Sequence, residues 1–304
     1  MQRKWLLFIT GINCLLVFGL IVWVFVAQST PRPGVERRSM DPPEPASLEE
    51  LVEQIRTSKH PLERVRAIRA LPDQSESIAV LEAVLVETLT DESIREWIQL
   101  QSIAFEKYAA LLGSADAVIH EAKRRVADSA MPLPLRDHAL RVAVQAVAQA
   151  GSAEGAGVGT SLSNALDELI TIAWEPSNTS LPGTALLGLA YLHGNQAGSV
   201  TREELVTLTK TALDDEAAIE NTVLCALQVI ADKGLEELAD LVTARISRPG
   251  SDAVLLRAMA ALSVIGDEAA IHPLEALQPA TAEQYHAAAQ AIERIRARSM
   301  PQVD

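Results

Sequence analysis

The chain has 304 residues, of which 48% are hydrophobic, only 4% are aromatic and 22% are charged. Its formal net charge of −14 disfavours binding to nucleic acids, whose phosphates repel an acidic protein and are neutralised by clustered Lys and Arg side chains. Alanine and leucine dominate the apolar residues, and both lose little side-chain freedom in a helix. We therefore expect an all-α protein that has no nucleic-acid partner.

The N-terminal end of the chain has the pattern of a membrane segment. Residues 5–27 contain no charged side chain, and at about 1.5 Å per residue a helix of this length crosses the roughly 30 Å hydrocarbon core of a bilayer. A basic stretch, residues 1–4, precedes it, and tryptophan occurs near both ends, where aromatic rings prefer lipid headgroups. The sequence predicts a transmembrane helix with these membrane-interface residues: Arg3, Lys4, Trp5 and Trp23.

This predicted span has two interpretations. A cleaved signal peptide is one of them, because Ala27-Gln28-Ser29 resembles a cleavage site. However, the apolar run exceeds the roughly 7–15 residues of a signal-peptide core, which favours an uncleaved signal anchor. The basic N-terminus favours a cytoplasmic start, so that the rest of the chain lies on the periplasmic or another extracytoplasmic side. The predicted localisation is therefore that of a single-pass membrane protein, with the membrane as a partner.

Two segments of different composition follow the predicted span. Residues 28–46 include five prolines, which fix φ and remove hydrogen-bond donors, so this segment is predicted to be an extended linker. From residue 47 onward, signals for helices recur without a gap long enough for another fold. Residues 47–304 are therefore predicted to form one helical domain.

Helix starts and helix ends alternate along this domain at regular intervals. Three pairs have the spacing of a capping box: Ser47 with Glu50, Thr201 with Glu204, and Thr281 with Gln284. Glycines, which reach positive φ at little cost, mark the predicted helix ends, and Asp267 is predicted to cap the helix after the last one. The predicted helix-end glycines are Gly113, Gly151, Gly194, Gly234 and Gly266. They are 38, 43, 40 and 32 residues apart, as expected for repeated helix pairs.

The clearest repeat lies in residues 251–298. The residues that characterise it are Leu256-Arg257-Ala258, Ala261-Leu262, Ile265-Gly266-Asp267-Glu268-Ala269-Ala270-Ile271 and Pro273-Leu274-Glu275-Ala276-Leu277. In these residues the chain resembles the HEAT-repeat family, in its bacterial HEAT-like form, and residues 61–128 match it in part. The resemblance implies a right-handed α-solenoid of about six HEAT-like helix pairs, here preceded by one transmembrane helix.

No catalytic, cofactor-binding or metal-binding residue is predicted, and we do not expect an enzyme. The glycine-rich residues 151–160 lack the Gly-Lys-Ser/Thr ending of a phosphate-binding loop. No nucleophile motif occurs, and the histidines have no metal-ligand spacing. Cys225 lies in an apolar helical run, and we expect it to be a small core residue.

Charged clusters are the remaining candidates for a binding surface. The basic cluster consists of Arg56, Lys59, Arg64, Arg66 and Arg69. The candidate acidic interaction patch consists of Asp214, Asp215, Glu216 and Glu220. Each cluster is either a solvated face or a docking surface, the acidic one for a basic partner. Our leading hypothesis is a scaffold that presents the solenoid to a protein partner. The alternatives are a subunit of an enzyme assembly, resembling lyase-like HEAT proteins, and a self-associating spacer.

Overall fold

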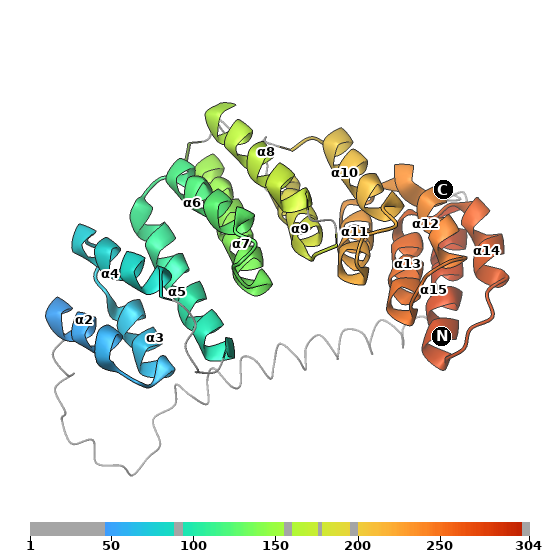
Figure 1. The fold of residues 1–304 in the computed structure, drawn as a ribbon. Helices are drawn as coiled ribbons and strands as arrows, with labels where there is room; N and C mark the ends of the chain where they lie inside the picture. The colour runs from blue at the N-terminus through green and yellow to red at the C-terminus, as the bar shows by residue number, and fades with distance from the viewer. Residues whose placement is uncertain (1–45, 88–93, 155–159, 176–177, 195–199, 300–304) are drawn as a thin grey trace, which may run out of the picture. The chain divides into compact units, whose positions relative to one another are not determined.

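The computed structural model describes residues 46–87, 94–154, 160–175, 178–194 and 200–299 (Figure 1). Every regular element within these ranges is a helix, and the ranges belong to one compact unit that begins at Ser47. The predicted basic stretch and span, and the predicted linker up to residue 45, lie outside the described residues.

The helices follow one another as pairs joined by short turns (Figure 1). The pairs in the described ranges are α2 (Leu48–Thr57) with α3 (Pro61–Ala70), α4 (Ser75–Leu85) with α5 (Ile94–Leu112), α6 (Ala115–Ala127) with α7 (Leu133–Glu154), α8 (Thr160–Trp174) with α9 (Leu181–Gly194), α10 (Arg202–Asp214) with α11 (Glu220–Lys233), α12 (Ala239–Ile246) with α13 (Asp252–Ile265), and α14 (Ile271–Glu275) with α15 (Ala282–Ser299). Two short 3-10 helices, Glu236–Leu238 and Glu268–Ala270, precede α12 and α14. The sequence predicted about six pairs, and the described ranges contain seven. The difference arises because the first and last pairs are shorter than the spacing of the glycines from which the number of repeats was predicted.

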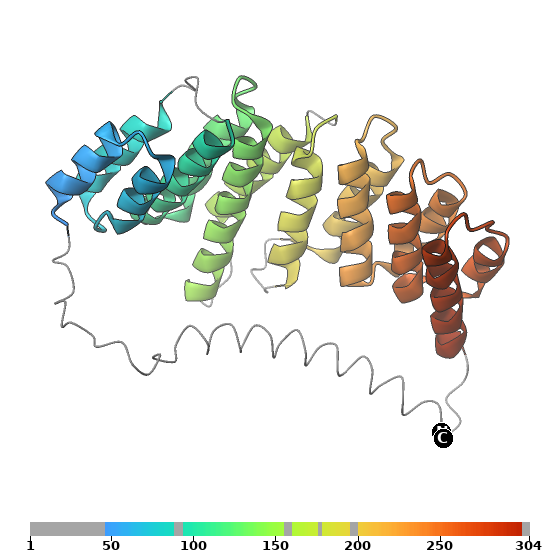
Figure 2. The same ribbon diagram turned by 90° about the horizontal axis from the view of Figure 1, so that it is seen from below.

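The pairs stack into two layers. The odd-numbered helices from α3 to α15 form one layer in which each helix packs on the next, and Figure 2 shows them side by side. Each even-numbered helix packs against its odd-numbered partner. No described helix packs on the opposite side of the odd-numbered helices, which we call the free face. This repeated pairing is an α-helical repeat solenoid.

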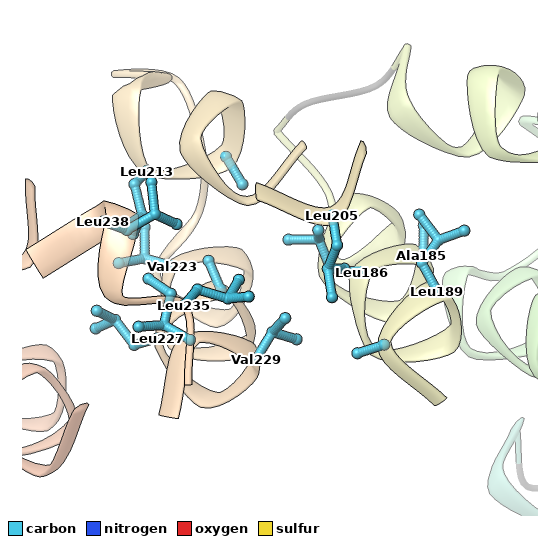
Figure 3. Packing of buried hydrophobic residues seen from close by; sticks show 14 of the residues in the cluster. Ala185, Leu186, Leu189, Leu205, Leu213, Val223, Leu227, Val229, Leu235 and Leu238 are labelled. Carbon is cyan, nitrogen blue, oxygen red and sulfur yellow. The ribbon is translucent and has the colours of Figure 1, made fainter. Parts of the chain in front are cut away.

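Aliphatic side chains between neighbouring helices form the core. One cluster of buried residues joins α2 to α5, and a second runs from Phe105 in α5 to Ile295 in α15. Figure 3 shows part of the second cluster, where Leu186 of α9, Leu205 of α10 and Leu227 of α11 are buried. Each fully buried side chain of this size contributes roughly 1.5–3 kcal/mol. The core is therefore continuous from repeat to repeat, and each pair depends on its neighbours.

The helix-start signals correspond to observed caps. The capping boxes at Ser47 and Thr201 are both complete, with the side chain of the glutamate at the third helical position returning to the cap residue's N–H. At α15, Gln284 Nα–H donates to Thr281 Oγ1 over 3.2 Å, but its Oε1 accepts from the N–H of Ala280. The buried Gln284 also donates through Nε2 to Asp252, so this cap ties α15 to α13.

The predicted helix-end glycines take three different roles. Gly113 and Gly234 follow α5 and α11 with φ of +68° and +58°, the left-handed conformation that favours glycine. Gly266 follows α13 but is extended, with φ of −65°, and glycine fits because a Cβ would lie 2.6 Å from the Leu262 carbonyl oxygen. Asp267 then caps the short helix after it, accepting from the N–H of Ala269 over 3.0 Å.

Two of these glycines do not follow a helix. Gly194 is the last residue of α9, where a Cβ would lie 2.6 Å from Lys233 Nζ. Gly151 lies inside α7, which continues to Glu154, so the helix end predicted at this position is corrected. A glycine costs only about 1 kcal/mol in a helix, and buried Val147 and Ala148 hold the preceding turn in the core. One left-handed glycine, Gly250 with φ of +77°, was not anticipated.

In the part of the chain that the structure describes, none of the helices combines the length and apolarity that a membrane crossing requires. The longest, α7, has 22 residues but carries Arg136, Asp137 and Arg141, which are costly in hydrocarbon. Residues 5–27 and their membrane-interface residues lie outside the described part. The predicted fold class, a solenoid preceded by one transmembrane helix, is corrected to an all-α solenoid, and the predicted single-pass membrane localisation is withdrawn.

Candidate functional site

A hollow of about 550 Å³ opens on the free face, where three odd-numbered helices meet. This volume lies within the roughly 300–1,000 Å³ that is typical of ligand sites. No even-numbered helix contributes to it. We call it the α9 groove, and its lining residues are Asp137, Arg141, Val144 and Gln145 of α7, Thr184, Leu187, Gly188 and Tyr191 of α9, and Asn221 and Cys225 of α11.

Two glycines of α9 let this helix approach both of its neighbours closely. A Cβ on Gly188 would lie 2.7 Å from Val144 Cγ2, a distance so short that the Val144 side chain or one of the two helices has to shift. On the other flank, a Cβ on Gly183 would lie 3.1 Å from both Cys225 Sγ and Thr222 Cα. The missing side chain at position 188 also leaves room in the groove itself, because Gly188 is part of its lining. These glycines therefore set the width of the groove.

One end of the groove is fixed by a hydrogen-bonded carboxylate. Asp137 of α7 accepts a hydrogen bond from Ser180 Oγ over 2.6 Å and another from Thr184 Oγ1 over 2.9 Å. Both hydroxyls belong to the start of α9, where Ser180 is followed by Leu181 and by a proline at position 182, which suits a first helical turn. Asp137 therefore links α7 to α9, and each of its two carboxylate oxygens accepts one hydrogen bond.

The other end of the groove is apolar and exposed. Leu187 is 41% exposed and Tyr191 is 53% exposed, and both lie on the free face of α9. Helix α9 is apolar on all sides, so packing against α7, α8, α10 and α11 still leaves apolar side chains in solvent. Exposed apolar side chains beside a hollow are typical of interaction sites, and tyrosine is enriched at interfaces.

The surroundings of two titratable groups, Cys225 in the groove and His138 near it, determine their state and orientation. Burial raises the pKa of the Cys225 thiol, with Asp137 adding to the effect and Arg257 opposing it, so the thiol stays protonated at neutral pH. Cys225 is half-buried on the groove wall rather than in the core as predicted, because it lies on the free face of α11. His138 points toward α5, where its Nε2 lies 3.1 Å from the Ser102 carbonyl oxygen.

A second, smaller hollow of about 370 Å³ lies on the other flank of α7, between α5, α6 and α7. Gln145 lines both hollows, so they adjoin across α7. The second hollow is lined by Glu106, Ala109 and Ala110 of α5 and by small or amide side chains of α7. The two hollows therefore share Gln145 as a common wall.

The candidate acidic interaction patch lies in the turn between α10 and α11. Asp214 pairs with Lys210 one turn earlier, and Asp215 accepts from the N–H of Ala217 over 2.8 Å. Glu220 lies in the first turn of α11, where the helix dipole favours a negative charge. Only Glu216 has no such local role. Three of the four acidic residues thus stabilise the turn that carries them.

The basic cluster is divided in a similar way. Arg64 of α3 donates to Glu87 at 2.6 Å and to the Ile55 carbonyl oxygen at 2.7 Å, so it connects α2 and α3 with the turn that follows α4. Arg66 and Arg69 are exposed on α3. No residue of the basic cluster or of the candidate acidic interaction patch lines the α9 groove. The groove was missed from the sequence because its residues come from three separate helices. Within the described ranges, no group of His, Cys, Asp and Glu side chains is arranged to hold a metal ion.

Comparisons with known proteins add little to this geometry. No protein-family model matches the chain, and no curated protein matches it. Among solved structures, the designed armadillo repeat protein YIII(Dq)4CqI matches with 18% sequence identity, covering 82% of this chain and 100% of that chain, at a TM-score of 0.23. That protein is also a helical repeat protein, but at this TM-score the assignment of a repeat solenoid rests on the helix pairs described above.

Proposed function

We propose that this chain is a protein-interaction scaffold, a HEAT-like array that binds a segment of another protein in the α9 groove. The observation on which this proposal rests is the exposure of Leu187 and Tyr191 beside a hollow formed by three helices. Tyrosine and arginine dominate the binding energy of many interfaces, and both residue types line this groove. Its thiol is protonated and its carboxylate is engaged by two hydroxyls, which supports a binding role over a catalytic one.

Photo-crosslinking on the full chain tests this proposal. A benzoylphenylalanine in place of Leu187 is compared with one in place of Leu62, an equally apolar residue of α3 that is 61% exposed. We expect a discrete adduct from position 187 and none from position 62. The captured protein, once purified, is expected to bind the unmodified chain and to lose at least tenfold in affinity to the Leu187→Glu variant, but not to Leu62→Glu.

Two results would overturn the proposal. Equal adducts from both positions would show nonspecific contact with exposed leucines. A purified partner that binds Leu187→Glu as tightly as the unmodified chain would show that the α9 groove is not the docking site. Circular dichroism of each variant establishes that the helices are intact, since an exposed leucine contributes little to folding.

A further inference from the structure

An arginine in the α9 groove lacks the partner that its position in the sequence would supply. Arg141 lies four residues after Asp137 on α7, the spacing at which opposite charges commonly pair on a helix. Asp137 instead turns to the hydroxyls of Ser180 and Thr184 on α9. Arg141 forms no hydrogen bond or ion pair with any residue in the described ranges, and its exposed side chain lines the groove.

Arginines that join helices elsewhere in the described ranges have a hydrogen-bond acceptor, which is either a carboxylate or, as for Arg136 and Arg298, a backbone carbonyl oxygen. Arg64 pairs with Glu87, Arg202 with Glu237 and Arg296 with Glu275, each at 2.6–2.8 Å and each between different helices or turns. A second cation lies near the groove: Arg257 of α13 donates only to the side-chain amide of Gln228, which carries no charge. Arg141 and Arg257 are therefore two guanidinium groups without a carboxylate partner among the described residues.

The apolar side chains and the unpaired cation face the same hollow. Leu187 and Tyr191 provide apolar contact area on α9, and Arg141 of α7 lines the same hollow, in which Gly188 faces Val144 and adds no side chain. An arginine binds a carboxylate through two parallel hydrogen bonds, which fixes its orientation as well as its position. A ligand that pairs with Arg141 and also packs against Leu187 and Tyr191 must present a carboxylate next to bulky apolar groups.

We infer that the α9 groove binds a peptide segment in which a single carboxylate, from Asp, Glu or a C-terminus, adjoins large apolar side chains. This inference rests on the proposed function and specifies the chemistry of the partner. Arg141 binds the carboxylate, and Leu187 and Tyr191 pack against the apolar side chains. The chain's net charge of −14 repels a run of acidic residues, so the match is one carboxylate and not a polyacidic segment. A basic segment would face Arg141 and Arg257 without a charge partner.

Selection from a random dodecapeptide phage library on the immobilised full chain tests this inference. We expect enriched peptides to combine Leu, Phe, Trp or Tyr with one acidic residue or a free C-terminal carboxylate. A synthetic peptide of this kind is then titrated by fluorescence anisotropy, beside a second peptide in which an amide replaces the carboxylate. The unmodified chain is expected to prefer the carboxylate peptide at least fivefold.

Matched variants separate the charge from the apolar contact. Arg141→Gln is expected to abolish the preference for the carboxylate peptide, whereas Arg248→Gln, which removes an exposed arginine beyond α12, is expected to retain it. Tyr191→Ala is expected to weaken both peptides at least fivefold, and Tyr285→Ala, which removes another exposed tyrosine, neither of them.

The outcomes distinguish this inference from the proposal on which it rests. Peptides that require Tyr191 but show no carboxylate preference, or that are rich in Lys and Arg, overturn the inference and leave the scaffold intact. A carboxylate preference that survives Arg141→Gln also overturns it. If no selected peptide depends on Leu187 or Tyr191, both the inference and the groove as a docking site are wrong.

Discussion

A buried arginine that packs against the second core cluster allows a quantitative test of how this solenoid is stabilised. Arg125 of α6 is only 2% exposed and is the largest of the fully buried side chains. Its guanidinium carbon lies 4.6 Å from the centre of the Phe105 ring, and its Nε donates to Glu121 Oε1 over 3.0 Å. Its Nη2 has no hydrogen-bond partner among the described residues. Burial lowers the pKa of Arg125, and the Glu121 carboxylate opposes this effect.

Two substitutions separate packing from charge at this position. Arg125→Ala and Arg125→Met both remove the cation, its contact with Phe105 and the unpaired Nη2, but only methionine keeps the aliphatic stem. Methionine has three buried groups beyond the alanine Cβ, namely Cγ, Sδ and Cε; at about 0.8 kcal/mol each, the value for a methylene, they give about 2.4 kcal/mol, and an unfilled cavity adds to this. We expect Arg125→Ala to unfold about 2–4 kcal/mol more easily than Arg125→Met.

The methionine variant itself is expected to lie within about 1 kcal/mol of the unmodified chain. The lost cation–π contact is worth about 0.5–2 kcal/mol, but an unpaired buried donor, which costs about 1–3 kcal/mol, is lost with it. Glu121 remains bonded to Arg124 at 2.6 Å, so it keeps a partner in both variants.

Urea unfolding of the full chain, followed by circular dichroism at 222 nm, measures these differences. Repeat arrays can unfold in parts, so hydrogen exchange of α5, α6 and α7 shows whether the loss is local to Arg125. If Arg125→Met were as unstable as Arg125→Ala, the guanidinium contacts and not the aliphatic packing would stabilise this site, and the reasoning would be refuted.

Two further predictions concern α7. Burial lowers the pKa of His138 more than Glu106 raises it, so the unfolded chain binds a proton below about pH 6.5 that the folded chain does not. The free energy of unfolding is expected to fall from pH 7 to pH 5, by up to about 1.4 kcal/mol per pH unit, and His138→Gln to flatten this urea-midpoint profile. Gly188→Ala should destabilise by about 1 kcal/mol, since overpacking against Val144 (about 1–3 kcal/mol) exceeds the gain in helix propensity (about 1). In a double-mutant cycle, Val144→Ala should relieve this loss, and additive effects would contradict it.

The helical fold could be predicted from the sequence because its signals are local. A capping box lies within four residues, so Ser47 and Thr201 mark the starts of α2 and α10 whatever packs against them. A glycine after a helix is a weaker signal, because glycine also serves where two segments approach closely. Gly266 is needed for the contact with Leu262, and Gly151 continues α7 because its neighbouring turn is buried. Tertiary contacts decide whether a glycine ends a helix or allows a close approach, and the sequence around the glycine does not reveal those contacts.

The α9 groove could not be predicted, because the local sequence pattern predicts an ion pair between two of its residues that the fold does not form. Sequence spacing pairs Asp137 with Arg141 on one helix turn, which would leave an ordinary solvated ion pair. In the fold, Asp137 instead accepts two short hydrogen bonds from the hydroxyls of Ser180 and Thr184. These bonds form because the packing of α7 on α9 brings the two hydroxyls next to the carboxylate. The contact that tightens α7 on α9 is thus the same contact that leaves Arg141 unpaired. The substitution Thr184→Val frees Asp137 Oδ1 while Ser180 still holds Oδ2. We expect this free oxygen to pair with Arg141 and to reduce the carboxylate preference without removing any charge.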